Sequence, residues 1–171
     1  QIGNLVNEFS DFARMPKPTL RKNNLVNLLK ENIKLLKELD NSIEIDLSSN
    51  SEKIILNSDK EQISRVFLNL IKNSIESIQQ KTENDSNFNK KITIELIEND
   101  DHINLVIVDN GIGFGKFSEN IKDILNPYFT TKKNGTGLGL SIVNKIINDH
   151  NGKIEFIPRN DGAEIKINFI K

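Results

Sequence analysis

Apolar residues recur every three or four positions in four segments of the chain, which is the spacing of a helix with one buried face. The four segments are 1–14, 24–39, about 59–80 and about 136–150. The third has the longest apolar stripe, formed by Ile63, Val66, Phe67, Leu70, Ile71, Ile75 and Ile78. Ser58 and Glu61 have the spacing of a capping box, so we expect this helix to begin at about Asp59.

Apolar and polar residues alternate in most of the segments between these helices, which predicts strands with one buried face. The strands are expected at 43–47, 92–96, 103–108, 153–157 and 163–170, with a shorter apolar run at 54–56. Because valines fill the positions between the isoleucines and leucine of 103–108, we expect that strand to be buried on both faces. This order of elements predicts an α+β fold: a two-layer α/β sandwich with helices on one face of a mixed, largely antiparallel sheet, preceded by an N-terminal helical stub.

Two prolines separate the first helix from the remainder of the chain, at Pro16 and Pro18. Proline disfavours a helix and stiffens the connection that follows it. So short a helix is marginal unless it packs on something, so we expect residues 1–18 to be the end of a longer dimerisation helix and a proline hinge. The alternative is an ordinary first helix of the domain. The first residue is Gln1 and not Met, so we expect a piece of a longer protein, with its main domain at 19–171.

Composition excludes several classes of function. At 171 residues, 36% hydrophobic and 27% charged, the chain suits one soluble globular domain with a real core. The net charge is −1, so no global basic field predicts a nucleic-acid partner. Without cysteine there is no disulfide framework and no cysteine-type zinc site. No apolar run approaches the roughly 20 residues of a membrane helix, so we expect no direct membrane contact by this segment.

A glycine-rich stretch before the last helix has the features of a phosphate-binding lid. Backbone N–H groups that precede a helix can approach an anion closely, and the positive end of the helix dipole strengthens them. Upstream residues add hydroxyl donors and positive charge. The stretch comprises Thr130, Thr131, Lys132, Lys133, Gly135, Gly137 and Gly139. The alternative is a flexible loop that happens to precede a helix.

The long helix carries Asn69 and Asn73 four residues apart, on one face beside its apolar stripe. Amide side chains at such positions can simply be exposed to solvent on the protein surface. However, Mg²⁺ prefers hard oxygen ligands and keeps several waters, so one or two side-chain oxygens suffice where phosphates supply the rest. We expect Lys72 and Arg65 to be surface residues, and the role of Glu76 stays open.

A second glycine motif follows the strand 103–108, with Asp109, Gly111 and Gly113 at alternate positions. A carboxylate there can accept a hydrogen bond from the amino group of adenine, and the carbonyl of guanine would be repelled. The alternative is a glycine-rich turn that Asp109 caps. The spacing fits neither a Rossmann fingerprint nor a Walker P-loop, since no Gly-Lys-Ser/Thr is present.

Together these motifs resemble the N, G1, F and G2 boxes of the ATP-binding domain of sensor histidine kinases, in order and in spacing. The resemblance covers about residues 19–171, and it rests on Asn69-x-x-x-Asn73, Asp109-x-Gly111-x-Gly113, residues 127–132 and residues 135–139. Residues 8–18 are similar to the end of the second dimerisation helix in nitrogen-regulation sensor kinases of the NtrY kind.

The resemblance implies an ATP- or ADP-binding site in which Asn73 holds Mg²⁺, Asp109 recognises adenine and a lid carries Lys132 over the phosphates. Asn69, Asn73 and Lys132 would be the catalytic residues. The implied nucleotide-binding residues are Asn69, Asn73, Asp109, Gly111, Gly113, Phe129, Thr130, Thr131, Lys132, Gly135, Thr136, Gly137, Leu138 and Gly139.

The resemblance also implies a reaction and its partners. The γ-phosphoryl group would pass to a histidine on the first dimerisation helix, absent from this segment, and then to an aspartate of a response regulator. The parent protein would be a homodimer, with this segment as a cytoplasmic domain and the parent anchored in the bacterial inner membrane.

Two other functions compete with this one. Related ATPases of topoisomerases, chaperones and mismatch repair carry a glutamate base where Asn69 stands. An amide cannot accept a proton at neutral pH, so we expect no rapid ATP hydrolysis. A nucleotide-sensing module without catalysis is the third possibility, against which the complete motifs argue.

Overall fold

The computed structural model describes residues 15–114 and 139–171, which form two sheets and three helices. The helices are α2 (Leu25–Lys37), α3 (Lys60–Asn84) and α4 (Gly139–Asp149). A two-stranded sheet pairs β1 (Arg21–Asn24) with β3 (Ile55–Ser58). The main sheet has the order β2-β4-β5-β7-β6, from β2 (Glu44–Ser49), β4 (Lys91–Glu98), β5 (His102–Asp109), β6 (Gly152–Arg159) and β7 (Gly162–Ile170). The expected helix at 1–14 and most of the expected lid lie outside the described residues.

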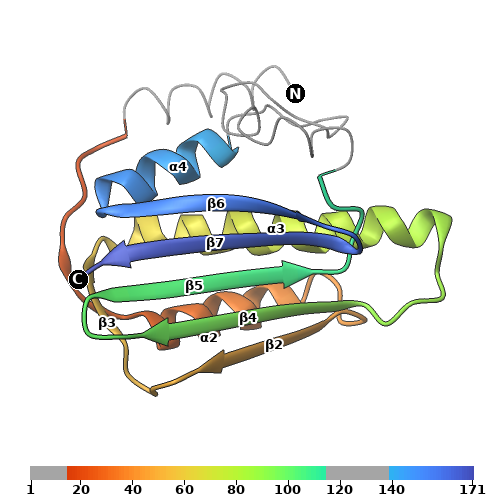
Figure 1. The fold of residues 1–171 in the computed structure, drawn as a ribbon, viewed down its shortest axis with the longest axis horizontal. Coiled ribbons are helices and arrows are strands. Elements are labelled where there is room, and N and C mark those ends of the chain that lie inside the picture. Colours follow the sequence, from red (N-terminus) through yellow and green to blue (C-terminus); the bar gives the residue numbers. More distant parts are fainter. Residues whose placement is uncertain (1–14, 115–138) are drawn as a thin grey trace.

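The predicted two-layer sandwich is confirmed. β2 and β4 are parallel, and every other neighbouring pair in the main sheet is antiparallel. Figure 1 shows the helices gathered on one face of this sheet, with α3 between α2 and α4. Each helix turns one apolar stripe toward the sheet, and the stripe of α3 is almost wholly withdrawn from water. The long helix that carries Asn69 and Asn73 is therefore the fixed centre of the helical layer.

The prediction that the strand at 103–108 is buried on both faces is wrong. Its residues alternate between buried and half-buried, and Val106 and Val108 lie on the half-buried side. The physical reason is that helices cover only one face of the main sheet, so alternate side chains of β5 meet no second layer.

The long helix begins one residue later than a capping box at Ser58 would place it. Its N-cap is Asp59, whose carboxylate accepts a hydrogen bond from the backbone N–H of Gln62 at 3.1 Å. The hydroxyl of Ser58 instead donates to the carbonyl of Leu56 at 3.0 Å, inside the small sheet.

The segment before α2 is bound into the domain along its length. The carbonyl of Pro16 accepts from the side chain of Gln62 at 3.0 Å, and the backbone N–H of Thr19 donates to the carboxylate of Asp59 at 2.9 Å. The side chain of Asn23 donates to the carbonyl of Ser58 at 2.9 Å. The connection to any preceding segment is therefore attached to the start of α3.

Candidate nucleotide site

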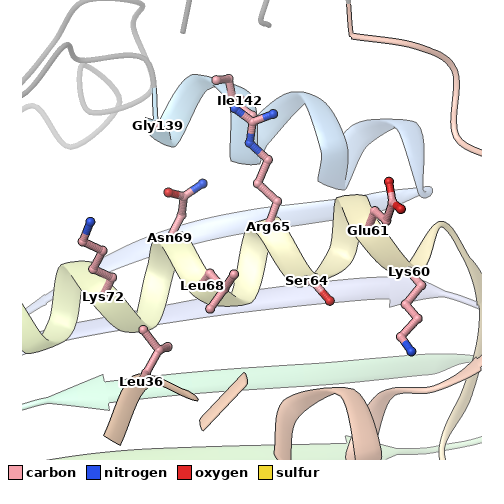
Figure 2. Close-up of a pocket in the computed structure, with 10 residues that line it drawn as sticks. All are labelled: Leu36, Lys60, Glu61, Ser64, Arg65, Leu68, Asn69, Lys72, Gly139 and Ile142. Atoms are coloured by element: carbon pink, nitrogen blue, oxygen red, sulfur yellow. The ribbon is translucent and has the colours of Figure 1, made fainter. Parts of the chain in front are cut away.

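An open groove of about 750 Å³ lies over α3 between α2 and the start of α4. Ten residues line it: Leu36, Lys60, Glu61, Ser64, Arg65, Leu68, Asn69, Lys72, Gly139 and Ile142. Figure 2 shows Arg65, Asn69 and Lys72 extending from α3 toward the side where α4 begins. Of the charged residues in this lining, three are cations and one is an acid, so the groove suits an anionic ligand.

Asn69 faces the first residue of α4. A Cβ built on Gly139 would lie 4.0 Å from the amide Oδ1 of Asn69, so the two predicted site residues are neighbours across the groove. The N-terminal end of a helix carries partial positive charge and unpaired N–H groups. The amide of Asn69 and the start of α4 therefore border the same space.

Arg65 and Lys72 share this groove with Asn69, although sequence analysis assigned them to the surface. Lys72 is exposed and Arg65 is half-buried, and the expectation that neither contacts a ligand stays a prediction. The signal that could have found them is helical spacing, since Arg65 and Lys72 stand four residues before and three after Asn69. Side chains at these spacings lie on one face of a helix.

Asp109 lies at the end of β5 and is only 5% exposed. Its Oδ1 accepts a hydrogen bond from the backbone N–H of Gly111 at 2.9 Å. Burial raises the pKa of the Asp109 carboxyl, and the N–H of Gly111, the hydroxyl of Ser74 and the charge of Lys81 each act in the opposite direction. A carboxylate held this way is an acceptor with little water to compete for it.

The glycines of this motif are explained by packing against the protein itself. A Cβ built on Gly111 would lie 2.6 Å from the carbonyl carbon of Ser77 on α3. Gly113 has a φ of 73°, and a Cβ there would lie 2.7 Å from the carbonyl oxygen of Gly162 at the start of β7. The backbone N–H of Ile112 donates to the hydroxyl of Ser77 at 3.0 Å. The loop 109–113 is thus clamped between α3 and the terminal hairpin, and neither Ser77 nor Gly162 was found by sequence analysis.

The remaining predicted site residues lie outside the described ranges. They are Phe129, Thr130, Thr131, Lys132, Gly135, Thr136, Gly137 and Leu138. Of the glycine-rich stretch, only Gly139 is described, and it is the first residue of α4.

The oxygen donors that line the groove are the amide of Asn69, the hydroxyl of Ser64 and the carboxylate of Glu61, and Asn73 lies on the same helix one turn beyond Asn69. Within residues 15–114 and 139–171, no group of three or more His, Asp or Glu side chains could hold a metal ion. Amide oxygens on α3 fit an ion such as Mg²⁺, which takes hard oxygen ligands, keeps waters and shares the phosphates of a nucleotide. They do not fit a metal that needs a complete protein cage.

Comparison with known proteins agrees with this arrangement. Residues 58–170 match the family described as histidine kinase-, DNA gyrase B- and HSP90-like ATPases. A putative sensor histidine kinase of the NtrY-like kind from Rickettsia typhi is 37% identical over 169 residues, which are 98% of this chain and 27% of that protein. The nitrogen regulation protein NtrY of Azorhizobium caulinodans is 33% identical, over 97% of this chain and 21% of its own length. The chain thus spans about a quarter of the curated relatives it matches.

Solved structures give the same result. The nucleotide-free catalytic domain of the histidine kinase ThkA has a TM-score of 0.74 and 29% identity, covering 89% of this chain and 95% of that domain. ThkA in complex with the response regulator protein TrrA has a TM-score of 0.79 and 25% identity, covering 99% of this chain and 47% of ThkA. The fold and site therefore define an ATP-binding domain. The chain belongs to the family of histidine kinase-, DNA gyrase B- and HSP90-like ATPases, and within it to the histidine kinase type.

None of the helices described in residues 15–114 and 139–171 is long and apolar enough to cross a membrane.

Proposed function

We propose that this chain binds ATP or ADP with Mg²⁺ and transfers the γ-phosphoryl group of ATP to a histidine on a dimerisation helix outside the chain. Asp109 accepts a hydrogen bond from the amino group of adenine, and Asn73 contributes its amide oxygen to Mg²⁺. Bound Mg²⁺ would neutralise charge that develops on the phosphates. Lys132 and the glycine-rich stretch ending at Gly139 would surround the phosphates.

The observation that carries this proposal is the position of Asn69. It borders the groove beside Gly139, at the motif position where the hydrolytic relatives carry a glutamate base. An amide can orient a group but cannot take a proton from water at neutral pH. Phosphoryl transfer to a delivered acceptor needs mainly positioning and neutralised charge, which an amide and two neighbouring cations can supply.

Neither histidine of the chain is suited to be the acceptor. His150 is 5% exposed, and both its ring nitrogens are hydrogen-bonded within the domain, to Ile146 and Asp59. His102 begins β5, and its Nδ1 lies 3.0 Å from the amide oxygen of Asn168 on the sheet. Asp100 and Asp101 precede it and would repel an incoming phosphate.

The proposed partners follow because the phosphoryl donor and the acceptor histidine lie on different domains. The acceptor lies on a dimerisation domain, so the parent protein is a homodimer in which this domain reaches a helix outside residues 19–171. A response regulator then receives the phosphoryl group on an aspartate, and support comes from the complex of the related ThkA with its response regulator. The parent is anchored in the bacterial inner membrane with this domain on the cytoplasmic side.

The test is an acceptor-transfer assay with γ-labelled ATP. The chain alone should remain unlabelled, and an added dimerisation hairpin carrying its acceptor histidine should gain acid-labile label. Asp109→Asn is the matched inactive variant. Release of inorganic phosphate without labelling of the hairpin would favour an ATPase, and ADP binding with neither reaction would favour a sensing module.

A further inference from the structure

Lys81 lies two turns beyond the asparagine motif on α3 and outside every motif described above. Its Nζ donates a hydrogen bond to the backbone carbonyl of Asn110 at 3.0 Å. The same Nζ lies 4.4 Å from the centre of the Phe88 ring, which is cation–π distance. The ammonium group is therefore held between an aromatic face and the residue that follows Asp109.

Asn110 is also fixed from its other side. Its side-chain oxygen accepts from the backbone N–H of Lys91 at 3.1 Å, at the start of β4. Its side-chain nitrogen donates to the carbonyl of Asn89. With the contact to Lys81, the segment that carries Asp109 is bound to α3, to β4 and to the connection between them.

Among residues 15–114 and 139–171, the groups that act on the Asp109 carboxyl come from its own loop and from α3. They are the N–H of Gly111, the hydroxyl of Ser74 and the charge of Lys81. Its partners on the neighbouring strands are Ile92 on β4 and Ala163 on β7, which carry no charge. Within the described part of the chain, Lys81 is thus the cation that acts on this carboxyl.

The state of this carboxyl decides what it can bind. An ionised carboxylate only accepts hydrogen bonds, which suits the amino group of adenine. A protonated carboxyl can also donate one, which suits the carbonyl of guanine. Burial favours the protonated form, and a nearby positive charge favours the ionised form.

We propose that Lys81 is a positioning residue for adenine recognition, which holds the Asp109–Asn110 segment in place and keeps the Asp109 carboxylate an acceptor. The proposal rests on the proposed function, because it assigns the base-specific contact to Asp109. It predicts that the charge of Lys81, and not only its bulk, sets adenine affinity in acid. Its effect reaches the nucleotide through Asp109 and requires no contact with the ligand.

The experiment compares Lys81→Met with Lys81→Arg and with Lys34→Met, which removes an exposed lysine of α2 far along the sequence. Dissociation constants for ADP are measured by calorimetry between pH 5.5 and 8.5. The ratio of variant to unaltered protein at each pH cancels the titration of the ADP phosphates. Urea unfolding of each variant verifies the fold, and Lys81→Gln serves as a second neutral replacement.

The expected result follows from the direction in which the charge of Lys81 moves the pKa of Asp109. The ionised carboxylate is the stronger acceptor for the adenine amino group, so ADP affinity is highest above the pKa of Asp109 and falls below it. Removing Lys81 raises that pKa further, so Lys81→Met should lose ADP affinity at a higher pH than the unaltered protein. At the acidic end we expect about a three- to tenfold loss of ADP affinity relative to the unaltered protein, and the loss should shrink as the pH rises. Lys81→Arg and Lys34→Met should match the unaltered protein, and Lys81→Met should discriminate less between ADP and GDP.

Two results would overturn the proposal in distinguishable ways. A ratio that is the same at every pH would mean that Lys81 acts only through packing, with the proposed function intact. Failure of the unaltered protein to bind ADP at any pH would overturn the proposed function and this inference together.

Discussion

The imidazole of His150 accepts a hydrogen bond from the backbone N–H of Asp59 at 3.0 Å, and so joins the last turn of α4 to the first turn of α3. Its other nitrogen, Nδ1, lies 2.7 Å from the carbonyl of Ile146 and donates to it, which fixes the neutral tautomer. Because α4 begins at Gly139, this contact joins the two helices at the end of α4 away from Gly139 and Asn69, next to Lys60 and Glu61 of the groove.

Replacing this buried histidine should destabilise the domain. In His150→Leu the N–H of Asp59 loses its acceptor, and a part-buried donor without a partner costs about 1–3 kcal/mol. His102→Leu is the control, because His102 lies on the half-exposed face of the sheet, and should cost less than about 1 kcal/mol. Urea unfolding at pH 7 measures both, and equal losses would show that the Asp59 contact contributes nothing.

The carboxylate of Asp59 should stabilise the fold in a pH-dependent way. Burial raises the pKa of this carboxyl, but the backbone N–H groups of Thr19, Gln62 and Glu61 outweigh burial and hold the pKa below its usual 3.8. A lowered pKa means that the stabilisation is present at neutral pH and is lost as the pH falls through the folded-state value. Asp59→Ala should therefore cost about 1 kcal/mol at pH 7 and progressively less below about pH 4. A difference in unfolding free energy that does not change between pH 7 and 3 would contradict this.

Asp109→Asn should separate stability from binding. The raised pKa of Asp109 means that its ionised form disfavours folding above pH 3.8, and an amide removes that penalty while still accepting from Gly111. We expect a higher melting temperature for the nucleotide-free variant at pH 7, with the gain disappearing in acid. Affinity for ATP should fall by more than about tenfold, or 1.4 kcal/mol. Unchanged preference for ATP over GTP in titration calorimetry would remove Asp109 from the base-recognition role.

Asn73→Ala should weaken the Mg²⁺-dependent part of nucleotide binding by about tenfold or more. Its effect on the affinity for ADP measured without Mg²⁺ should be smaller. The reason is the loss of one amide oxygen from the metal's shell. Asn27→Ala, on the exposed face of α2, controls for removal of a helical asparagine. The measurement is calorimetry with Mg²⁺ and with a chelator. Equal losses under both conditions would make Asn73 a structural residue.

Two glycines of the site should respond differently to alanine. In Gly111→Ala the new methyl group meets the backbone of Ser77 and Ile78, which cannot yield, so we expect a loss of about 1–3 kcal/mol. In Gly139→Ala the methyl group has 4.0 Å to Asn69, and stability should change by less than about 0.5 kcal/mol. Thermal unfolding of the two variants in parallel provides the comparison, and a reversed order would be inconsistent with the packing described.

Elements whose residues follow a hydrophobic period could be predicted from the sequence, and those made by distant contacts could not. The stripe from Ile63 to Ile78 predicted α3, and alternation predicted β4 and β7. The strand β1 has the sequence Arg-Lys-Asn-Asn, which carries no apolar alternation, and it is a strand because it pairs with β3. One-sided coverage of the sheet, and hence the half-exposure of Val106, likewise depends on tertiary arrangement.

The same distinction between local patterns and distant contacts applies to the residues of the candidate site. Local spacing identified Asn69, Asn73 and the acid at the end of β5, because those patterns lie within one helix or one turn. The contacts of Lys81 with Asn110 and of Gly162 with Asp109 join residues 29 and 53 positions apart, and no local pattern signals them. The sequence therefore predicts the acid at the end of β5 but neither its burial nor its neighbouring cation.

The clamp on the loop 109–113 has a consequence for inhibitor design. A Cβ on Gly162 would contact the carbonyl oxygen of Asp109, and Gly111 lies directly against α3, so this end of the site is already formed before a ligand arrives. A small flat heterocycle that donates to Asp109 would lose little entropy to loop ordering, and such compact ligands reach up to about −1.5 kcal/mol per non-hydrogen atom. Fragment screening should therefore start from the Asp109 end, and growth toward Asn69 should follow.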